Sequence, residues 1–368
     1  MPDVARMRSS ILKLTSGAIS TLLGVKGASA ASIEQAKDNN DVIFSLEYLD
    51  GVITTNYSLN PESASKGVRA IVDTGSPFLI VPTICTSLWG CPSRQELQAL
   101  RPSGLEDTVE VFGGQDYDTS WALLNRGVTP LPPPSSTRKG DYPRLLRNDA
   151  VVATVGSDIM LPPGGVFFGL IKYKSQFIRP TFLGQTNVKS FSIDLRKNEL
   201  SMSTKRKISP GSPNSFHMID LRPLGDSVYH YACRVANVRV NGVSITDDLP
   251  MAQPIYAIFD TGTSGCGIHD VLYFGESMPL PARRVELDLE NVLGERVTLK
   301  AEATRKELFV VTPSKIPWFD ASTNKHPEDM PDYTDSGRFE PRVIVLGTSF
   351  FKNRKLTIDI DDAKIELV

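Results

Sequence analysis

Two short segments of the chain place an aspartate in the same local pattern. Asp73 lies in AIVDTGSPF and Asp260 lies in AIFDTGTSG, so each aspartate follows an apolar run and precedes threonine, glycine and a hydroxyl residue. An apolar run that ends in such a turn predicts a buried strand with the aspartate presented at its end. Two loops of this kind, facing each other across a pseudo-twofold axis, would bring the two carboxyl groups side by side.

Adjacent carboxyl groups offer a specific kind of hydrolytic chemistry. Two like charges in contact cannot both ionise readily, so we expect Asp73 and Asp260 to share one proton in mildly acid solution. The ionised group would deprotonate a bound water, while the protonated group would polarise the carbonyl of an amide. The residues after each glycine, Ser76 and Thr263, have hydroxyls that can donate hydrogen bonds to the carboxylates.

The residues between the aspartate and the hydroxyl predict how each loop is held. Gly75 and Gly262 would allow a positive φ and a close approach of the backbone. Thr74 and Thr261 offer hydroxyls that can bond backbone groups of the facing loop. A lone Asp-Thr-Gly triplet is most often a tight turn, but two copies with matched flanks favour a duplicated catalytic site.

The match between the two halves of the chain continues beyond the aspartates. Apolar residues lead into glycine in Gly165–Leu170 and again in Val343–Thr348, and a strand, a polar turn and a returning strand follow at Phe191–Met202 and Leu356–Leu367. Most other segments also have the pattern of short strands, and the best helix signal is Ser93–Leu100, with a serine N-cap. The sequence therefore predicts an all-β protein with two homologous β lobes.

Length and composition agree with two lobes in an ordinary soluble protein. The 368 residues exceed the roughly 250–300 at which a single hydrophobic core stops growing. We expect a leader at 1–40, an N-terminal lobe at 41–205, a linker at 206–215 and a C-terminal lobe at 216–368. A net charge of −2 argues against nucleic-acid partners, and no apolar run approaches the roughly 20 residues of a membrane span. We expect a monomer without stable membrane insertion.

The first 40 residues differ in composition from the rest of the chain. Basic residues precede a mildly apolar stretch and then Ala28-Ser29-Ala30, a small-x-small pattern typical of signal cleavage. This pattern predicts entry into the secretory pathway, with secretion or delivery to a vacuole or lysosome, and a glycosylation sequon at Asn56 adds support. The alternatives are a transit peptide for a plastid or another organelle, a short prosegment, and a tail without an address.

The four cysteines can be grouped in two pairs, for which the sequence gives different expectations of disulfide formation. Cys85 and Cys91 enclose the loop TSLWG, which can close as a disulfide in an oxidising compartment. Cys233 and Cys266 can form a second bridge or remain buried free thiols, and the sequence leaves both possibilities open. The four histidines are scattered without the spacing of metal ligands, so we expect no metal and no cofactor.

At the two aspartate segments the chain resembles the pepsin-like aspartic proteases. DTGSPFLIVP with the cysteine loop is similar to the first active loop of that family, FDTGTS to the second, and GVFFGL and VIVLGTSFF to the elements behind them. The resemblance extends over about residues 41–368 and implies a bilobed fold with an active-site cleft between the lobes. It implies that Asp73 and Asp260 form the catalytic dyad of an endopeptidase that cleaves polypeptides between bulky apolar residues.

The resemblance also implies roles for the residues around the dyad. Thr74 and Thr261 would interlock the two loops, and Ser76 and Thr263 would bond the outer carboxylate oxygens. The glycines would let backbone amides approach the carboxylates.

The flap hairpin that covers the cleft in that family is altered here. Phe112 stands before Gly113 where the family usually has a tyrosine, Tyr117 lies beyond the turn, and the tryptophan that often partners the flap tyrosine is replaced by Ile80. Phe112, Gly113 and Tyr117 are the candidate substrate-binding residues, although either ring can instead pack within the hairpin. The altered flap keeps a second function open, that of a weakly active or inactive pepsin-fold binding or inhibitor protein.

Overall fold

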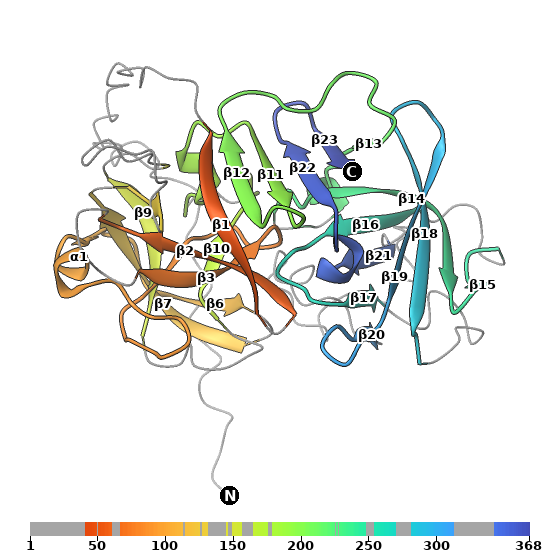
Figure 1. Ribbon diagram of the computed structural model, residues 1–368. Helices are drawn as coiled ribbons and strands as arrows, with labels where there is room; N and C mark the ends of the chain where they lie inside the picture. Colours follow the sequence, from red (N-terminus) through yellow and green to blue (C-terminus); the bar gives the residue numbers. More distant parts are fainter. Residues whose placement is uncertain are drawn as a thin grey trace, which may run out of the picture. The chain divides into compact units, whose positions relative to one another are not determined.

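Strands make up most of the regular structure in the computed structural model, where they form three mixed sheets (Figure 1). The structure describes residues 41–49, 51–60, 67–112, 115–125, 127–131, 145, 149–156, 165–175, 179–224, 226, 228–247, 254–269, 281–312 and 342–368. The predicted all-β class is confirmed. The predicted leader at 1–40 and Gly113 lie outside this part of the chain.

The first sheet joins strands from both halves of the sequence. Its order is β10-β3-β2-β1-β12-β11-β22-β23-β13, with β8 paired to β2. The strands are β1 (Val42–Leu49), β2 (Val52–Ser58), β3 (Val68–Asp73), β8 (Thr129–Pro130), β10 (Phe167–Gly169), β11 (Ser190–Asp194), β12 (Glu199–Ser203), β13 (Ser215–His217), β22 (Lys355–Asp359) and β23 (Lys364–Leu367). The long strand β1 pairs with β12 over its first half and with β2 over its second half.

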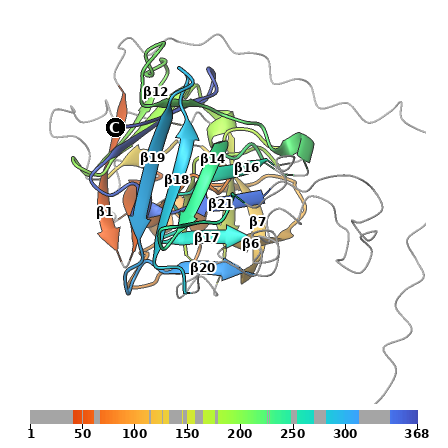
Figure 2. The ribbon, with the colours of Figure 1, turned by 90° about the vertical axis from the view of Figure 1, so that its right-hand side faces the viewer.

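The second sheet comes entirely from the C-terminal half of the chain. Its order is β19-β18-β14-β16-β21-β17-β20, with β15 paired to β14. The strands are β14 (Ala232–Val240), β15 (Val243–Ser244), β16 (Ile255–Phe259), β17 (Cys266–His269), β18 (Arg284–Glu290), β19 (Arg296–Glu302), β20 (Phe309–Thr312) and β21 (Arg342–Leu346). Figure 2 shows β19, β18, β14 and β16 next to one another. Exposed and buried residues alternate along β19, as expected for a strand with one face toward a core.

The third sheet has the order β4-β9-β7-β5, with β6 paired to β7. Its strands are β4 (Ile80–Pro82), β5 (Arg101–Pro102), β6 (Thr108–Phe112), β7 (Gln115–Leu124) and β9 (Ala150–Val155). The described helices are α1 (Arg94–Gln98) and the short 3₁₀ helices η1 (Leu183–Gln185), η2 (Arg222–Leu224) and η4 (Thr348–Phe350). None of these described helices is long and apolar enough to span a membrane.

Helix α1 forms where the serine N-cap predicted it. The Ser93 hydroxyl accepts a hydrogen bond from the Glu96 N–H, and the Glu96 carboxylate accepts one from the Ser93 N–H. This reciprocal capping box satisfies two backbone donors that a helix start otherwise leaves unbonded.

The predicted match between the two halves is present in the strand pairing. β10 lies parallel to β3 with Gly169 opposite Asp73, and β21 lies parallel to β16 with Leu346 opposite Phe259. The predicted hairpins β11–β12 and β22–β23 both form, and β11 also pairs with β22. Each aspartate therefore lies where one strand of a parallel pair ends.

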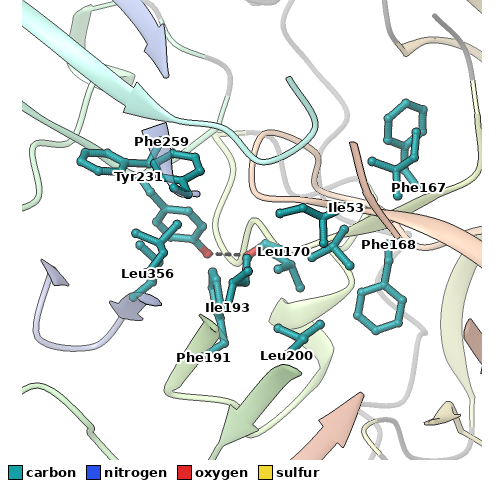
Figure 3. Packing of buried hydrophobic residues seen from close by; sticks show 14 of the residues in the cluster. Ile53, Phe167, Phe168, Leu170, Phe191, Ile193, Leu200, Tyr231, Phe259 and Leu356 are labelled. Atoms are coloured by element: carbon teal, nitrogen blue, oxygen red, sulfur yellow. Dashed lines mark hydrogen bonds between the residues drawn. The ribbon is translucent and has the colours of Figure 1, made fainter. Parts of the chain in front are cut away.

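Tyr231, the residue before β14, ties the second sheet to the first half of the chain. Its hydroxyl donates to the Leu170 carbonyl at 2.5 Å, and its ring packs edge-on against Phe191 with centroids 5.5 Å apart (Figure 3). All three residues are fully buried. Because Leu170 follows β10 and Phe191 lies in β11, this contact fixes the start of β14 against the first sheet.

The structure decides between the alternatives that the sequence left open for the cysteines. Cys85 and Cys91 form the predicted disulfide, whereas Cys233 and Cys266 are buried free thiols. Cys233 lies on β14 and Cys266 on β17, with β16 and β21 between them. Three strand spacings of about 4.8 Å separate the two residues by roughly 14 Å. A disulfide requires Cα atoms within about 7 Å.

Candidate active site

Asp73 and Asp260 lie next to each other at the ends of two strands. Asp73 is the last residue of β3, and Asp260 directly follows β16. A Cβ atom added at Gly75 would lie 2.9 Å from Asp260 Oδ1, and one added at Gly262 would lie 2.6 Å from Asp73 Oδ1. Each loop therefore places its glycine against the carboxyl group of the other loop. The aspartates are only 7% and 6% exposed, so both carboxyl groups are largely removed from water.

Two threonines interlock the aspartate loops through four hydrogen bonds. The Thr74 hydroxyl donates to the Phe259 carbonyl at 2.7 Å and accepts from the Thr261 N–H at 2.9 Å. The Thr261 hydroxyl donates to the Val72 carbonyl at 2.7 Å and accepts from the Thr74 N–H at 3.2 Å. Both threonines are completely buried. The reciprocal pattern matches the role that the sequence predicted for these hydroxyls.

Glycine is required in both loops for close approach and not for a left-handed backbone. Neither Gly75 nor Gly262 has a positive φ, so that part of the prediction is wrong. A Cβ at Gly262 would lie 2.5 Å from Asp73 Cγ, which is closer than real Cβ contacts. The Gly75 N–H donates to Asp73 Oδ1 at 2.7 Å, and the Gly262 N–H donates to Asp260 Oδ1 at 2.9 Å. Each glycine thus supports one carboxyl group and leaves space for the other.

The hydroxyls after the glycines behave differently in the two loops. The Thr263 hydroxyl donates to Asp260 Oδ2 at 2.8 Å, as expected. The Ser76 hydroxyl is buried and makes no hydrogen bond with any residue that the structure describes, so its expected bond to Asp73 does not form. The backbone holds this loop instead, because the Ser76 carbonyl accepts from the Ile171 N–H at 3.0 Å and the Ser76 N–H faces the Asp73 carboxyl group.

Burial and charge together change the ionisation of the pair. The pKa of Asp73 is raised well above its usual value of 3.8, mainly by burial and then by the charge of Asp260 and a hydrogen bond between the two side chains. The backbone N–H groups of Gly75 and Ser76 lower the pKa of Asp73 and only partly offset this effect. A raised pKa disfavours the ionised form, so the pair retains a proton in mildly acid solution.

A pocket of about 310 Å³ opens beside the second aspartate loop. Thr263 and Ser264 line one part of it, and Leu308 and Val310 line another. Leu308 is 61% exposed and Val310 is 52% exposed, although both are apolar. An apolar side chain of a ligand would lose contact with water here, next to a residue that bonds Asp260.

The candidate flap residues lie in the β6–β7 hairpin. Phe112 ends β6 opposite Gln115, but its side chain is outside the described part of the structure, as is Gly113. Tyr117 lies opposite Glu110, is 3% exposed and belongs to the hydrophobic core. The structure therefore brings the dyad and its six predicted supporting residues together, and it places the Tyr117 ring inside the core.

The sequence did not point to a charged cluster beside the first loop. Lys174 Nζ lies 5.0 Å from the centre of the Phe78 ring, in the chain segment that follows the first aspartate. Arg179 forms an ion pair of 3.3 Å with Glu110. Lys174 and Arg179 lie in one segment, but Glu110 is 69 residues from Arg179, so no local sequence pattern marks the cluster.

Within the described ranges, no group of three or more histidine, cysteine, aspartate or glutamate side chains could hold a metal ion. A comparison with models of known protein families gave no match, and a comparison with curated proteins found no relative.

Proposed function

We propose that this chain is an aspartic endopeptidase with a bilobed, pepsin-like fold. The observation that carries the proposal is the reciprocal contact in which Gly75 lies against Asp260 and Gly262 lies against Asp73. Two buried carboxyl groups in contact disfavour folding, because both desolvation and repulsion act against the charged forms. A carboxyl group with a strongly raised pKa, held against a second carboxyl group by a dedicated interlock, favours a catalytic role over a structural one.

The mechanism uses one water molecule and one shared proton. Asp73, whose pKa is raised, holds the proton, and the ionised Asp260 takes a proton from a water between the two groups. The water oxygen forms a bond to the peptide carbonyl carbon while Asp73 gives its proton to the carbonyl oxygen. In the second step Asp260 gives its proton to the amide nitrogen, one hydroxyl of the tetrahedral diol returns a proton to Asp73, the C–N bond breaks, and an acid and an amine leave. The dyad ends with one proton, as it began.

The proposed substrates are polypeptides with bulky apolar residues near the cleaved bond. The exposed Leu308 and Val310 beside Thr263 support this preference, because they provide an apolar surface within the reach of the dyad loop. The proposed arrangement has an N-terminal lobe at 41–205 and a C-terminal lobe at 216–368, with the substrate between them. No metal and no cofactor enters the proposed reaction, and the enzyme acts as a monomer.

The proposed location is the secretory pathway, with secretion or delivery to a vacuole or lysosome. The Cys85–Cys91 disulfide supports an oxidising compartment. Delivery to a plastid or another organelle is the alternative, and microscopy of the tagged full chain distinguishes the two.

Hydrolysis of an apolar peptide between about pH 3 and pH 7, with and without pepstatin, tests the proposed function. We expect cleavage that is strongest in acid and is blocked by the inhibitor, because the dyad needs one proton. Asp73→Asn and Asp260→Asn should each abolish cleavage and leave the circular dichroism spectrum unchanged. Substantial cleavage by either folded variant would contradict the shared-proton mechanism.

The second candidate function is that of a catalytically weak binding or inhibitor protein. The unbonded Ser76 hydroxyl favours it, because one loop lacks a bond that the other has. A folded wild-type protein that binds peptides but cleaves none at any pH would support this function and exclude the endopeptidase.

A further inference from the structure

A cluster of charged and aromatic residues lies beside the first aspartate loop. Its floor consists of the Phe78 and Trp121 rings, which pack edge to face with centroids 4.9 Å apart. Lys174 Nζ lies 5.0 Å from the centre of the Phe78 ring, and the Arg179 guanidinium lies 5.4 Å from the Trp121 ring. Glu110, on β6, is the third charged member. With two cations and one anion, the cluster has one surplus positive charge.

The surplus charge belongs to Lys174. Glu110 Oε1 accepts hydrogen bonds from the Thr108 hydroxyl at 3.0 Å and from Arg179 Nη1 at 3.3 Å, so the ion-pair partner of Glu110 is Arg179 and not Lys174. The Lys174 ammonium makes no hydrogen bond or ion pair with a residue that the structure describes, although the Lys174 backbone forms a β-bridge with Val228. Partial burial lowers the pKa of Lys174, and the neighbouring Arg179 also lowers it, while Glu110 raises it. A carboxylate that bound here would provide a counter-charge in direct contact with Lys174, which no described residue supplies.

The cluster lies within reach of a peptide bound at the dyad. Phe78 follows Gly75 by three residues, so their Cα atoms are at most about 11 Å apart. Gly75 itself lies against Asp260. An extended peptide advances about 3.3 Å per residue, so we expect the substrate side chains within about three residues of the cleaved bond to be the ones that approach Lys174.

We propose that Lys174 makes this enzyme prefer an acidic side chain at one position within three residues of the cleaved bond. The proposal rests on the endopeptidase function and adds a charged subsite to the apolar pocket on the other loop. Arg179 has a positioning role, because it neutralises Glu110 and so leaves the Lys174 ammonium available to the substrate. An aspartate or glutamate of the substrate would place its carboxylate against the Lys174 ammonium, which lies over the Phe78 ring.

Matched peptides that differ only by glutamate or glutamine test this subsite. The residue is placed in turn at each of the three positions on either side of a fixed apolar bond, and kcat/KM is measured at about pH 5.5, where glutamate with a pKa near 4.3 is ionised. We expect one position at which glutamate is favoured about tenfold, as a charge-assisted hydrogen bond would give. Equal rates for both peptides at all six positions would overturn the proposal.

Substitutions of Lys174 separate charge recognition from packing. Lys174→Met keeps the apolar stem, and it should bring the glutamate-to-glutamine ratio of kcat/KM to about one. Lys174→Glu should reverse the preference in favour of lysine. Lys300→Met, an exposed site on β19, is the matched control and should keep the wild-type ratio. A ratio that survives Lys174→Met would assign the preference to another residue and overturn the proposal.

Binding to the inactive Asp73→Asn variant distinguishes this inference from the proposed function. Fluorescence anisotropy with the same labelled peptides reports recognition without hydrolysis. A glutamate preference in binding, with no cleavage by the wild-type protein, would retain the subsite and exclude the endopeptidase. Cleavage without any glutamate preference would retain the endopeptidase function and exclude the Lys174 subsite. The absence of both binding and cleavage would overturn both proposals.

Discussion

The threonine interlock makes a strong prediction about stability. In Thr74→Val a methyl group replaces a hydroxyl that donates to the Phe259 carbonyl and accepts from the Thr261 N–H. Valine has almost the same shape as threonine, so the change removes hydrogen bonds without opening a cavity. Both lost bonds are completely buried, and no water can replace them.

The expected loss of stability follows from these two bonds. A buried backbone group left without its partner costs about 1–3 kcal/mol, so Thr74→Val should reduce the free energy of unfolding by about 2–6 kcal/mol. Thr261→Val removes the equivalent pair of bonds, to the Val72 carbonyl and the Thr74 N–H, and should have an effect of similar size. Changes of this size are a large fraction of the roughly 5–15 kcal/mol that stabilises a folded protein.

Urea denaturation followed by tryptophan fluorescence and circular dichroism measures this effect. Thr83→Val is the matched control, because the Thr83 hydroxyl also bonds one backbone carbonyl, that of Val155, but the residue is exposed. Water can replace that bond, so the control should lose less than about 0.5 kcal/mol. If Thr74→Val were no more destabilising than Thr83→Val, the interlock would not hold the two loops together.

Three further predictions concern the aspartates and the glycines. Gly262→Ala should abolish cleavage, because its Cβ would lie 2.5 Å from Asp73 Cγ, whereas Gly156→Ala, with no atom within 4 Å, should retain the wild-type rate. Since the folded pKa of Asp73 is raised, stability should fall as pH rises from about 4 toward that pKa, and urea titrations of Asp73→Asn should show a flatter pH dependence. Hydrogen bonds from Arg239 lower the pKa of Asp288 from its usual 3.8 to about 2. The ionised Asp288 therefore stabilises the fold above about pH 3.8, and this stabilisation is lost as pH falls toward 2. In Asp288→Asn the free energy of unfolding should no longer fall in this acid range. An unchanged dependence of the free energy of unfolding on pH would show that Asp288 is not the group responsible.

The sequence could predict the aspartate loops because their signal is both local and repeated. An apolar run that ends in Asp-Thr-Gly specifies a buried strand and a turn, and the second copy shows that the first is not accidental. The role of glycine was less accessible, because the sequence cannot separate positive φ from close approach. Only the facing carboxyl group, which is distant in sequence, shows that close approach is the reason at Gly75 and Gly262.

Features assembled from distant segments could not be predicted. Alternating apolar and polar residues indicated the terminal hairpins, but alternation does not specify a partner strand. The pairing of β11 with β22 therefore could not be predicted from the sequence. The cluster of Glu110, Lys174 and Arg179 is similar, because each residue alone has the pattern of an ordinary surface charge. Their meaning depends on the Phe78 and Trp121 rings that bring them together.

The hydroxyl difference between the two loops bears on how the proposed mechanism assigns its acid and its base. A hydrogen bond to a carboxylate favours the ionised form, and Thr263 gives such a bond to Asp260 while Ser76 gives none from its hydroxyl to Asp73. Two identical loops would bind the shared proton equally well, and neither aspartate would be committed to act as the base. Because the loops diverge directly after the glycine, the proposed mechanism assigns the shared proton to Asp73, whose pKa is raised, and the role of the base to Asp260. The duplicated loops thus bring two carboxyl groups to one place, and a single hydroxyl distinguishes them.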